Sequence, residues 1–81
     1  MENRSRYTAV SGYKDDKYLG KIKTYGIDGF DNDGNVCLHI DSVTYDSVLA
    51  EKIVSALNRN DVSLINANDV IRDMVLGAVL R

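Results

Sequence analysis

The C-terminal segment is the feature that most limits how this chain can fold. Between residues 70 and 80 only Arg72, Asp73 and Gly77 interrupt the apolar side chains. A helix on the surface of a small domain hides an apolar stripe about 100° wide and presents polar residues elsewhere. A helix over about residues 67–80 therefore carries more apolar surface than one small sheet can cover.

This surplus is large for a chain of 81 residues, because a domain of that size buries only about 60 to 65% of its unfolded surface. If the face directed at the sheet consists of Ile71, Met74, Val75 and Ala78, the outer flank consists of Leu76, Val79 and Leu80. Burying each flank side chain contributes about 1.5 to 3 kcal/mol. We expect this flank to be an interaction surface, either for a second copy in a two-fold homodimer or for another protein. The alternative is that it is buried in a groove of its own protomer.

Strand patterns fill the first half of the chain and helix patterns the second, an order typical of an α+β domain. Strand-forming and alternating apolar residues predict three strands, over about residues 6–13, 18–30 and 35–41. Helical spacing predicts two helices, over about residues 47–58 and 67–80. We therefore expect a single domain, residues 1–81, in which a small antiparallel sheet of about three strands is packed by two C-terminal helices.

Local signals refine the strands. "KDDK", residues 14–17, is a polar turn candidate, and the apolar positions of residues 18–30 change phase. Such a change predicts a bulge at Gly20 or Gly26. In the third strand one face is expected to carry Val36, Leu38 and Ile40.

Further signals refine the helices. Asp46 can cap the first helix, whose apolar stripe is expected to be Leu49, Ile53, Ala56 and Leu57. Asn58-Arg59-Asn60 predicts its end, and Asn66 with Asp69 resembles the start of the second helix. Between the helices, three apolar residues are expected to return over the core: Val62, Leu64 and Ile65.

"GFDNDGN", residues 29–35, resembles a calcium loop but predicts a hairpin turn. Asp33-Gly34 is a strong hairpin signal, since glycine tolerates the positive φ of a tight turn. A helix-loop-helix calcium loop has an acidic first residue and a glutamate at its twelfth position. With Gly34 at the sixth position these places hold Gly29 and Ile40. We therefore expect no metal here.

Cys37, His39 and Asp41 share one face of the third strand and form the only set of nucleophile, base and acid in the sequence. No oxyanion hole is recognisable, and a chain this small has little room for a substrate cleft. Three ligands also fall short of a structural zinc site. We expect a half-exposed strand face with no catalytic residues, no metal and no cofactor, so the chain is not expected to be an enzyme.

A basic face on the first strands gives an alternative function. Tyr18, Lys21, Lys23 and Tyr25 could stack on bases and contact phosphates. The net charge of −2 and the neighbouring Asp15 and Asp16 argue against nucleic acid. Phosphate-loop motifs are absent from the sequence.

Several short motifs resemble a family of small uncharacterised proteins, a domain of unknown function, from clostridia and related Firmicutes. The matching positions are Tyr25-Gly26-Ile27, Asp41-Ser42, Asn58-Arg59, Asp69-Val70 and Asp73, within about residues 18–76. "SLINAN" departs from the family's entry to the last helix, because it has neither proline nor histidine. The resemblance implies the fold and a bacterial source, but it implies no activity.

The sequence therefore predicts a small non-enzymatic interaction or regulatory protein, for which an inhibitor carried by a mobile element is one possible form. A single cysteine excludes an internal disulfide, and we expect a cytoplasmic location. We expect no signal peptide, because the first residues lack an apolar stretch, and no membrane span, because no apolar run approaches the roughly 20 residues that cross a bilayer. A membrane is therefore not expected as a partner.

Overall fold

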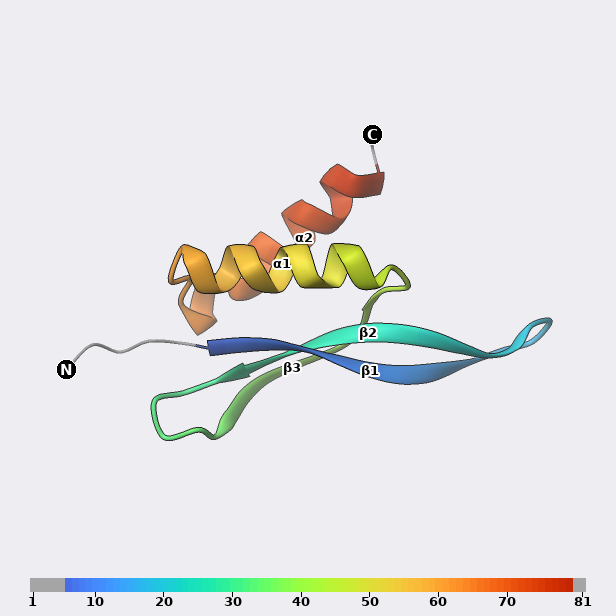
Figure 1. Cartoon of the computed structure of the whole chain (residues 1–81), viewed down its shortest axis with the longest axis horizontal. Helices are drawn as coiled ribbons and strands as arrows, with labels where there is room; N and C mark the ends of the chain where they lie inside the picture. The colour runs from blue at the N-terminus through green and yellow to red at the C-terminus, as the bar shows by residue number, and fades with distance from the viewer. Residues whose placement is uncertain (1–5, 80–81) are drawn as a thin grey trace.

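The computed structural model describes residues 6–79 and contains three strands followed by two helices (Figure 1). The strands are β1 (Arg6–Asp16), β2 (Gly20–Phe30) and β3 (Val36–Thr44), and they form an antiparallel sheet in the order β1-β2-β3. The helices are α1 (Ser47–Arg59) and α2 (Leu64–Val79), and both lie on the same side of the sheet. The α+β architecture predicted from the sequence is confirmed.

The sheet is wider at one end than at the other. β1 and β2 pair in an unbroken register from Arg6–Phe30 to Asp16–Gly20, whereas β3 pairs with β2 only between Tyr25 and Phe30. Residues 12–24 therefore form a two-stranded ribbon, here called the arm, which extends beyond the helices (Figure 1). The arm accounts for the elongated shape of the molecule, 50 × 29 × 18 Å.

The turn of the arm lies three residues later than predicted. It consists of residues 17–19, so β1 continues to Asp16. The carboxylate of Asp16 accepts hydrogen bonds from the amides of Tyr18, at 2.8 Å, and Leu19, at 2.9 Å. Gly20 follows with a φ of +79°, a conformation that glycine adopts without strain. The side chain that was predicted to lie in the turn therefore caps it from the end of the strand.

The predicted irregularity at Gly26 is present, but the extra residues belong to β3. Tyr25 faces Thr44 while Ile27 faces Ile40, so β3 has the longer path. Ser42, with a φ of 52°, takes up the additional length. A Cβ atom at Gly26 would collide with the carbonyl oxygen of Ile40. Glycine here admits the bulged backbone of β3, which pairs again at Thr44, beyond its predicted end.

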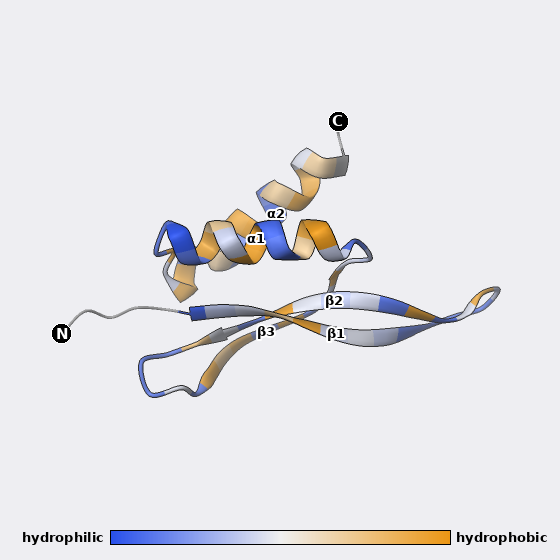
Figure 2. Ribbon diagram, viewed as in Figure 1, coloured by the Kyte–Doolittle hydropathy of each residue, from blue (hydrophilic) through white to orange (hydrophobic). Residues whose placement is uncertain are grey.

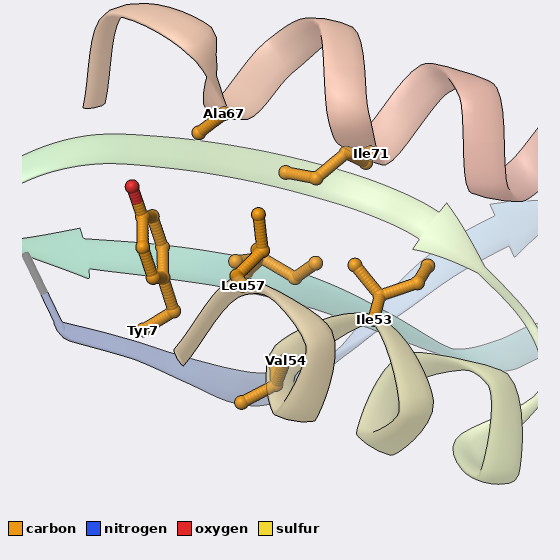
Figure 3. Packing of buried hydrophobic residues seen from close by; sticks show 7 residues of the cluster. Tyr7, Ile53, Val54, Leu57, Ala67 and Ile71 are labelled. Carbon is orange, nitrogen blue, oxygen red and sulfur yellow. The ribbon is translucent and has the colours of Figure 1, made fainter. Parts of the chain in front are cut away.

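One hydrophobic core joins the wide end of the sheet to both helices (Figure 3). Its most buried side chains are Tyr7, Ile27, Ala50, Ile53, Leu57, Ala67 and Ile71. α1 contributes Ala50, Ile53, Val54 and Leu57, so its buried stripe is rotated from the predicted one, and Leu49 and Ala56 lie at its margins, partly buried. The predicted cap is confirmed, since the Asp46 carboxylate accepts from the Val48 amide at 2.9 Å.

The sequence indicated only that Asn58 lies at the end of α1, but its side chain also binds β1. Its side-chain oxygen accepts from the Tyr7 amide at 2.9 Å, and its NH₂ group donates to the Tyr7 carbonyl at 3.0 Å. The Tyr7 hydroxyl donates to the carbonyl of Val62 at 2.7 Å. These three bonds, here called the Tyr7 latch, attach the start of β1 to the end of α1. Asn58 thereby occupies the edge of the sheet as a neighbouring strand would.

α2 begins at Leu64, three residues before its predicted start. Ser63 precedes it, and the Asn66 side chain donates to the Ser63 hydroxyl at 3.1 Å. This pair has the spacing of a capping box, one turn ahead of the predicted Asn66 and Asp69. Leu64 and Val62 are partly buried as expected, but Ile65 is 90% exposed because it lies on the outer side of the first turn of the helix.

The turn predicted for residues 29–35 is confirmed as the β2–β3 connection. Asp31 organises it, since its carboxylate accepts from the amides of Asp33 and Asn35, both at 2.9 Å. The Gly34 amide donates to the Asp31 carbonyl at 3.1 Å, and Gly34 has a φ of +83°. The backbone bonds from Asn35 and Asp33 hold the pKa of the Asp31 carboxyl below its usual value.

Candidate interaction surface

The C-terminal half of α2 has little of the sheet beneath it. α2 crosses α1, and its last turns rise away from the sheet (Figure 1). Its fully buried residues, Ala67 and Ile71, belong to its first half. Further along, Met74 and Val75 are partly buried, and Leu76 is 50% exposed. Figure 2 shows that this projecting part of the helix is mostly hydrophobic.

An apolar groove lies between α2 and β3, beside Leu76. Its volume is about 360 Å³. The apolar lining consists of Ile71, Val75 and Leu76 from α2 and Ile40 and Val43 from β3, and the polar residues around it are Asp41, Ser42, Asn68 and Arg72. We call this region the α2–β3 groove. It lies where the bulged part of β3 faces the middle of α2.

A second depression, of about 510 Å³, lies on the other side of α2, against the start of α1. It is lined by Asp46, Val48, Leu49, Lys52, Asp73, Met74, Gly77 and Ala78. The projecting half of α2 therefore has open space on two sides. Charged residues occur along this second depression from both helices, so it is the more polar of the two.

The predicted flank is only partly within the described residues. Leu76 is half exposed, as predicted for that position. The side chain of Val79 and the whole of Leu80 lie outside the residues that the structure describes. Ala78, which was expected to face the sheet, is exposed, because the helix has already left the sheet at that point. The sequence did not predict that Ile40 and Val43 form the opposite wall of the groove. The only signal that pointed to them was the alternation of apolar residues in β3.

The basic alternative lies on the arm. Tyr18 is 85% exposed in its turn, and Lys21 and Lys23 are exposed on β2. The Lys23 ammonium lies 5.7 Å from the ring centre of the partly buried Tyr25, and that of Lys17 lies 5.8 Å from the ring centre of Tyr18. These cation–π contacts place lysines over ring faces on which bases would stack.

Acidic residues also lie on the arm and weaken its positive potential. Asp15 is directly opposite Lys21 in the β1–β2 register. Asp16 is held at the turn, where the amides of Leu19 and Tyr18 keep the pKa of its carboxyl below the usual value. Tyr18, Lys21 and Lys23 therefore lie on the arm and Tyr25 just beyond it, where β3 joins the sheet, with acidic residues between the lysines.

The possible catalytic set is divided by the structure. Cys37 donates to the Asp31 carboxylate at 3.4 Å, and this bond raises the pKa of the thiol, which disfavours the nucleophilic thiolate. His39 instead lies between two carboxylates, with Nδ1 on Asp28 and Nε2 on Asp41 at 2.8 Å. The bonds to Asp28 and then to Asp41 raise the pKa of His39. His39 and Asp41 are thus brought together, but Cys37 is paired elsewhere.

The residues from 6 to 79 offer neither a metal centre nor a membrane span. Within that range no group of three or more His, Cys, Asp or Glu side chains is arranged to hold a metal ion. No helix in the same range is long and apolar enough to cross a membrane.

The resemblance to small clostridial proteins stays a prediction. The chain matches no protein-family model, no curated protein and no solved structure.

Proposed function

We propose that the protein is a small non-enzymatic interaction module that binds a partner protein through the outer side of α2. The observation that carries the proposal is the half-exposed Leu76 beside the α2–β3 groove. Exposed apolar surface that adjoins a groove is typical of protein contact sites. The partner is another protein or a second copy of the chain.

The shape and chemistry of the groove define the partner's contact. A volume of about 360 Å³ lies at the lower end of the range for small-molecule sites, which runs from about 300 to 1,000 Å³. Such a groove is well suited to one or two apolar side chains of a helix or loop. Arg72 and Asp41 at its margin could bind polar groups around such an anchor, in the usual arrangement of an apolar centre and a polar rim.

The test compares two exposed apolar residues of the same helix. Leu76→Glu places a charge beside the groove, whereas Ile65→Glu places one at the far end of α2, where Ile65 is 90% exposed. We expect both variants to fold, and only Leu76→Glu to lose at least tenfold in affinity, because the charge would be desolvated at the contact. Self-association is measured by sedimentation, and binding of another protein by pull-down and titration with the recovered partner. Equal behaviour of Leu76→Glu and the wild type in both measurements would reject the proposal.

Nucleic-acid binding is the second candidate function. It is supported by the uncovered arm, where Tyr13 and Tyr18 are 69% and 85% exposed among several lysines. Phosphate contacts make retention on an immobilised oligonucleotide fall steeply with salt. Lys21→Gln combined with Lys23→Gln should then elute at lower salt than the wild type. Elution of the wild type in the void volume would reject this candidate.

We also propose a bacterial and cytoplasmic setting. The resemblance supports the first, and the exposed free thiol of Cys37 supports the second, because reducing compartments keep such thiols unpaired. A tagged copy expressed in a clostridial host and followed by fractionation would test the location.

A further inference from the structure

Among residues 6–79, no strand pairs with the outer edge of β1, and Asn58 binds it only at Tyr7. β1 is the first strand in the order β1-β2-β3, so no strand of the described chain lies beyond it. Proteins usually protect such edges with proline, bulges, charges or very short strands. β1 has eleven residues, pairs with β2 without a register shift, and has no charged residue between Thr8 and Tyr13. Its middle part thus lacks the usual protection.

The Tyr7 latch shows which backbone groups point outward. The amide and carbonyl of Tyr7 bind Asn58, so they point away from β2. In an antiparallel strand this direction alternates from residue to residue. The amides and carbonyls of Ala9, Ser11, Tyr13 and Asp15 must therefore point outward as well. They present donors and acceptors at the spacing that another strand requires.

Gly12 lies at the centre of this open edge without a local reason for being glycine. Its φ is not positive, and a Cβ atom built there meets no heavy atom within 4 Å. Glycine weakens a strand, and in a strand interior it often marks a site where another backbone approaches closely. Within the described part of the protomer, neither a turn nor a close contact accounts for Gly12.

We propose that β1 pairs with β1 of a second copy, antiparallel about a two-fold axis at Gly12, so that two sheets become one six-stranded sheet. Ser11 of each copy then pairs with Tyr13 of the other, and Ala9 pairs with Asp15. These are the residues whose backbone groups point outward, so the pairing provides about eight hydrogen bonds, two for each pair. The surface is separate from the α2–β3 groove, and the inference does not rest on the proposed function.

Asn58 and the length of β1 together favour this register, since an axis at Tyr13 would place Ala9 opposite Lys17 of the partner subunit, in the turn, and leave one fewer hydrogen-bonded pair. The outward-pointing backbone groups belong to odd-numbered residues. They can pair with one another only if the two-fold axis passes through a residue of β1, because an axis between two residues would pair odd-numbered with even-numbered positions. An axis at Ser11 would place Asp15 of the partner subunit opposite Tyr7, where Asn58 already binds. An axis at Gly12 places the partner's Lys17 there, and Lys17 is the first residue of the turn, where the chain leaves the strand. The partner strand therefore ends where the latch begins.

Charges agree with this register. Lys14 of one copy faces Val10 of the other, and Asp16 faces Thr8, so no two like charges are directly opposite. The side chains of the central pair are hydrogen atoms, which permits the close approach of a pair that is not hydrogen-bonded, about 4.5 Å between Cα atoms. The second copy thus explains both the glycine and the uncharged centre of the strand.

A cysteine scan tests the register directly. Gly12→Cys, in a Cys37→Ser background, places two thiols at the axis, where the Cα separation of about 4.5 Å lies within the range of a disulfide. We expect nearly complete cross-linking to a dimer of twice the 9.0 kDa chain mass under a mild oxidant. Val10→Cys is the matched control, because its two copies would be four residues out of register, about 13 Å apart, and it should stay monomeric on a non-reducing gel.

A second variant tests the pairing without cysteine. Ser11→Pro removes an amide that points outward, so the β1–β2 ladder is kept while the intermolecular ladder loses a donor. We expect it to weaken dimerisation at least tenfold in sedimentation, while Ser11→Ala behaves like the wild type. Leu76→Glu should leave the Gly12→Cys cross-link unchanged, which separates this surface from the proposed function. Equal cross-linking of Gly12→Cys and Val10→Cys, or a wild type of 9.0 kDa at all concentrations, would overturn the inference.

Discussion

α1 and α2 lie on the same side of one sheet, yet they use their apolar side chains differently. α1 runs over the wide end of the sheet and buries four residues on one stripe. α2 is longer and more apolar, but its fully buried residues are Ala67 and Ile71. Beyond Ile71 the helix rises away from the sheet (Figure 1).

The difference lies in what each helix has beneath it. α1 lies over the sheet along its length and is attached to β1 by the Tyr7 latch at its end. Its apolar side chains are therefore buried by its own protomer. The second half of α2 lies beside the bulge of β3 and rises away from the sheet, so the α2–β3 groove stays open between them. The composition of α2 therefore predicts that it has more apolar side chains than the sheet can cover. The path of the helix determines which of them are exposed.

The largest expected effect contrasts two leucines. Leu57 of α1 is fully buried and Leu76 of α2 is half exposed. Leu57→Ala should lower the free energy of unfolding by about 2 to 5 kcal/mol through lost burial and a cavity, whereas Leu76→Ala should cost less than about 1 kcal/mol. Urea denaturation of both variants at low protein concentration measures the difference. Similar losses would mean that α2 is packed as well as α1, and the comparison would fail.

An intermediate effect contrasts the two ends of α2. A Cβ atom at Gly29 would lie 2.8 Å from Leu64 Cδ2 at the start of α2 and 3.1 Å from the Tyr7 ring. Gly29→Ala should therefore destabilise by about 1 to 3 kcal/mol through overpacking. Gly77→Ala meets no atom within 4 Å and should stabilise by about 0.5 to 1 kcal/mol, because alanine favours the helix.

Thermal denaturation of the two alanine variants measures this contrast. A loss of stability in Gly77→Ala would show that something covers the end of α2 within the protomer. An unchanged Gly29→Ala would show that Leu64 moves aside, so that the start of α2 is as loosely held as its end.

The smallest effect concerns the face of the sheet that neither helix covers. Asp28 and Asp41 raise the pKa of His39 above its ordinary 6.5, so the folded chain holds this proton more tightly than the unfolded chain. The resulting stabilisation is complete below about pH 6.5 and is lost as the pH rises through the folded pKa. Because the groups are exposed, the change should be small and should shrink in high salt.

Urea denaturation at about pH 5.5 and about pH 8.5 measures this dependence. Urea is chosen because, unlike guanidinium, it carries no charge that would screen the interaction. His39→Gln should remove most of the difference between the two conditions, and Cys37→Ser is the control, since it leaves the histidine in place. A wild type that is more stable at the higher pH would contradict the assignment.

Elements and their order could be predicted from the sequence because they depend on local periodicity. The strands, both helices, the Asp46 cap and the turn at Asp33-Gly34 all follow from neighbouring residues. The buried stripe of α1, the bulge in β3 and the start of α2 were misplaced, since each is determined by contacts between distant segments. The surplus of apolar residues predicted that Leu76 lies on the outer flank of the helix. The groove beside it could not be predicted, because its other wall is the bulged part of β3.

The Tyr7 latch joins residues separated by 51 positions along the chain. During synthesis the first strand leaves the ribosome before Asn58 and Val62 do. Until then neither helix covers the hairpin of β1 and β2, and the Asn58 side chain does not yet bind the edge of β1. Closure of the molecule is therefore a late event for each nascent chain, because the latch cannot form until Asn58 and Val62 have left the ribosome.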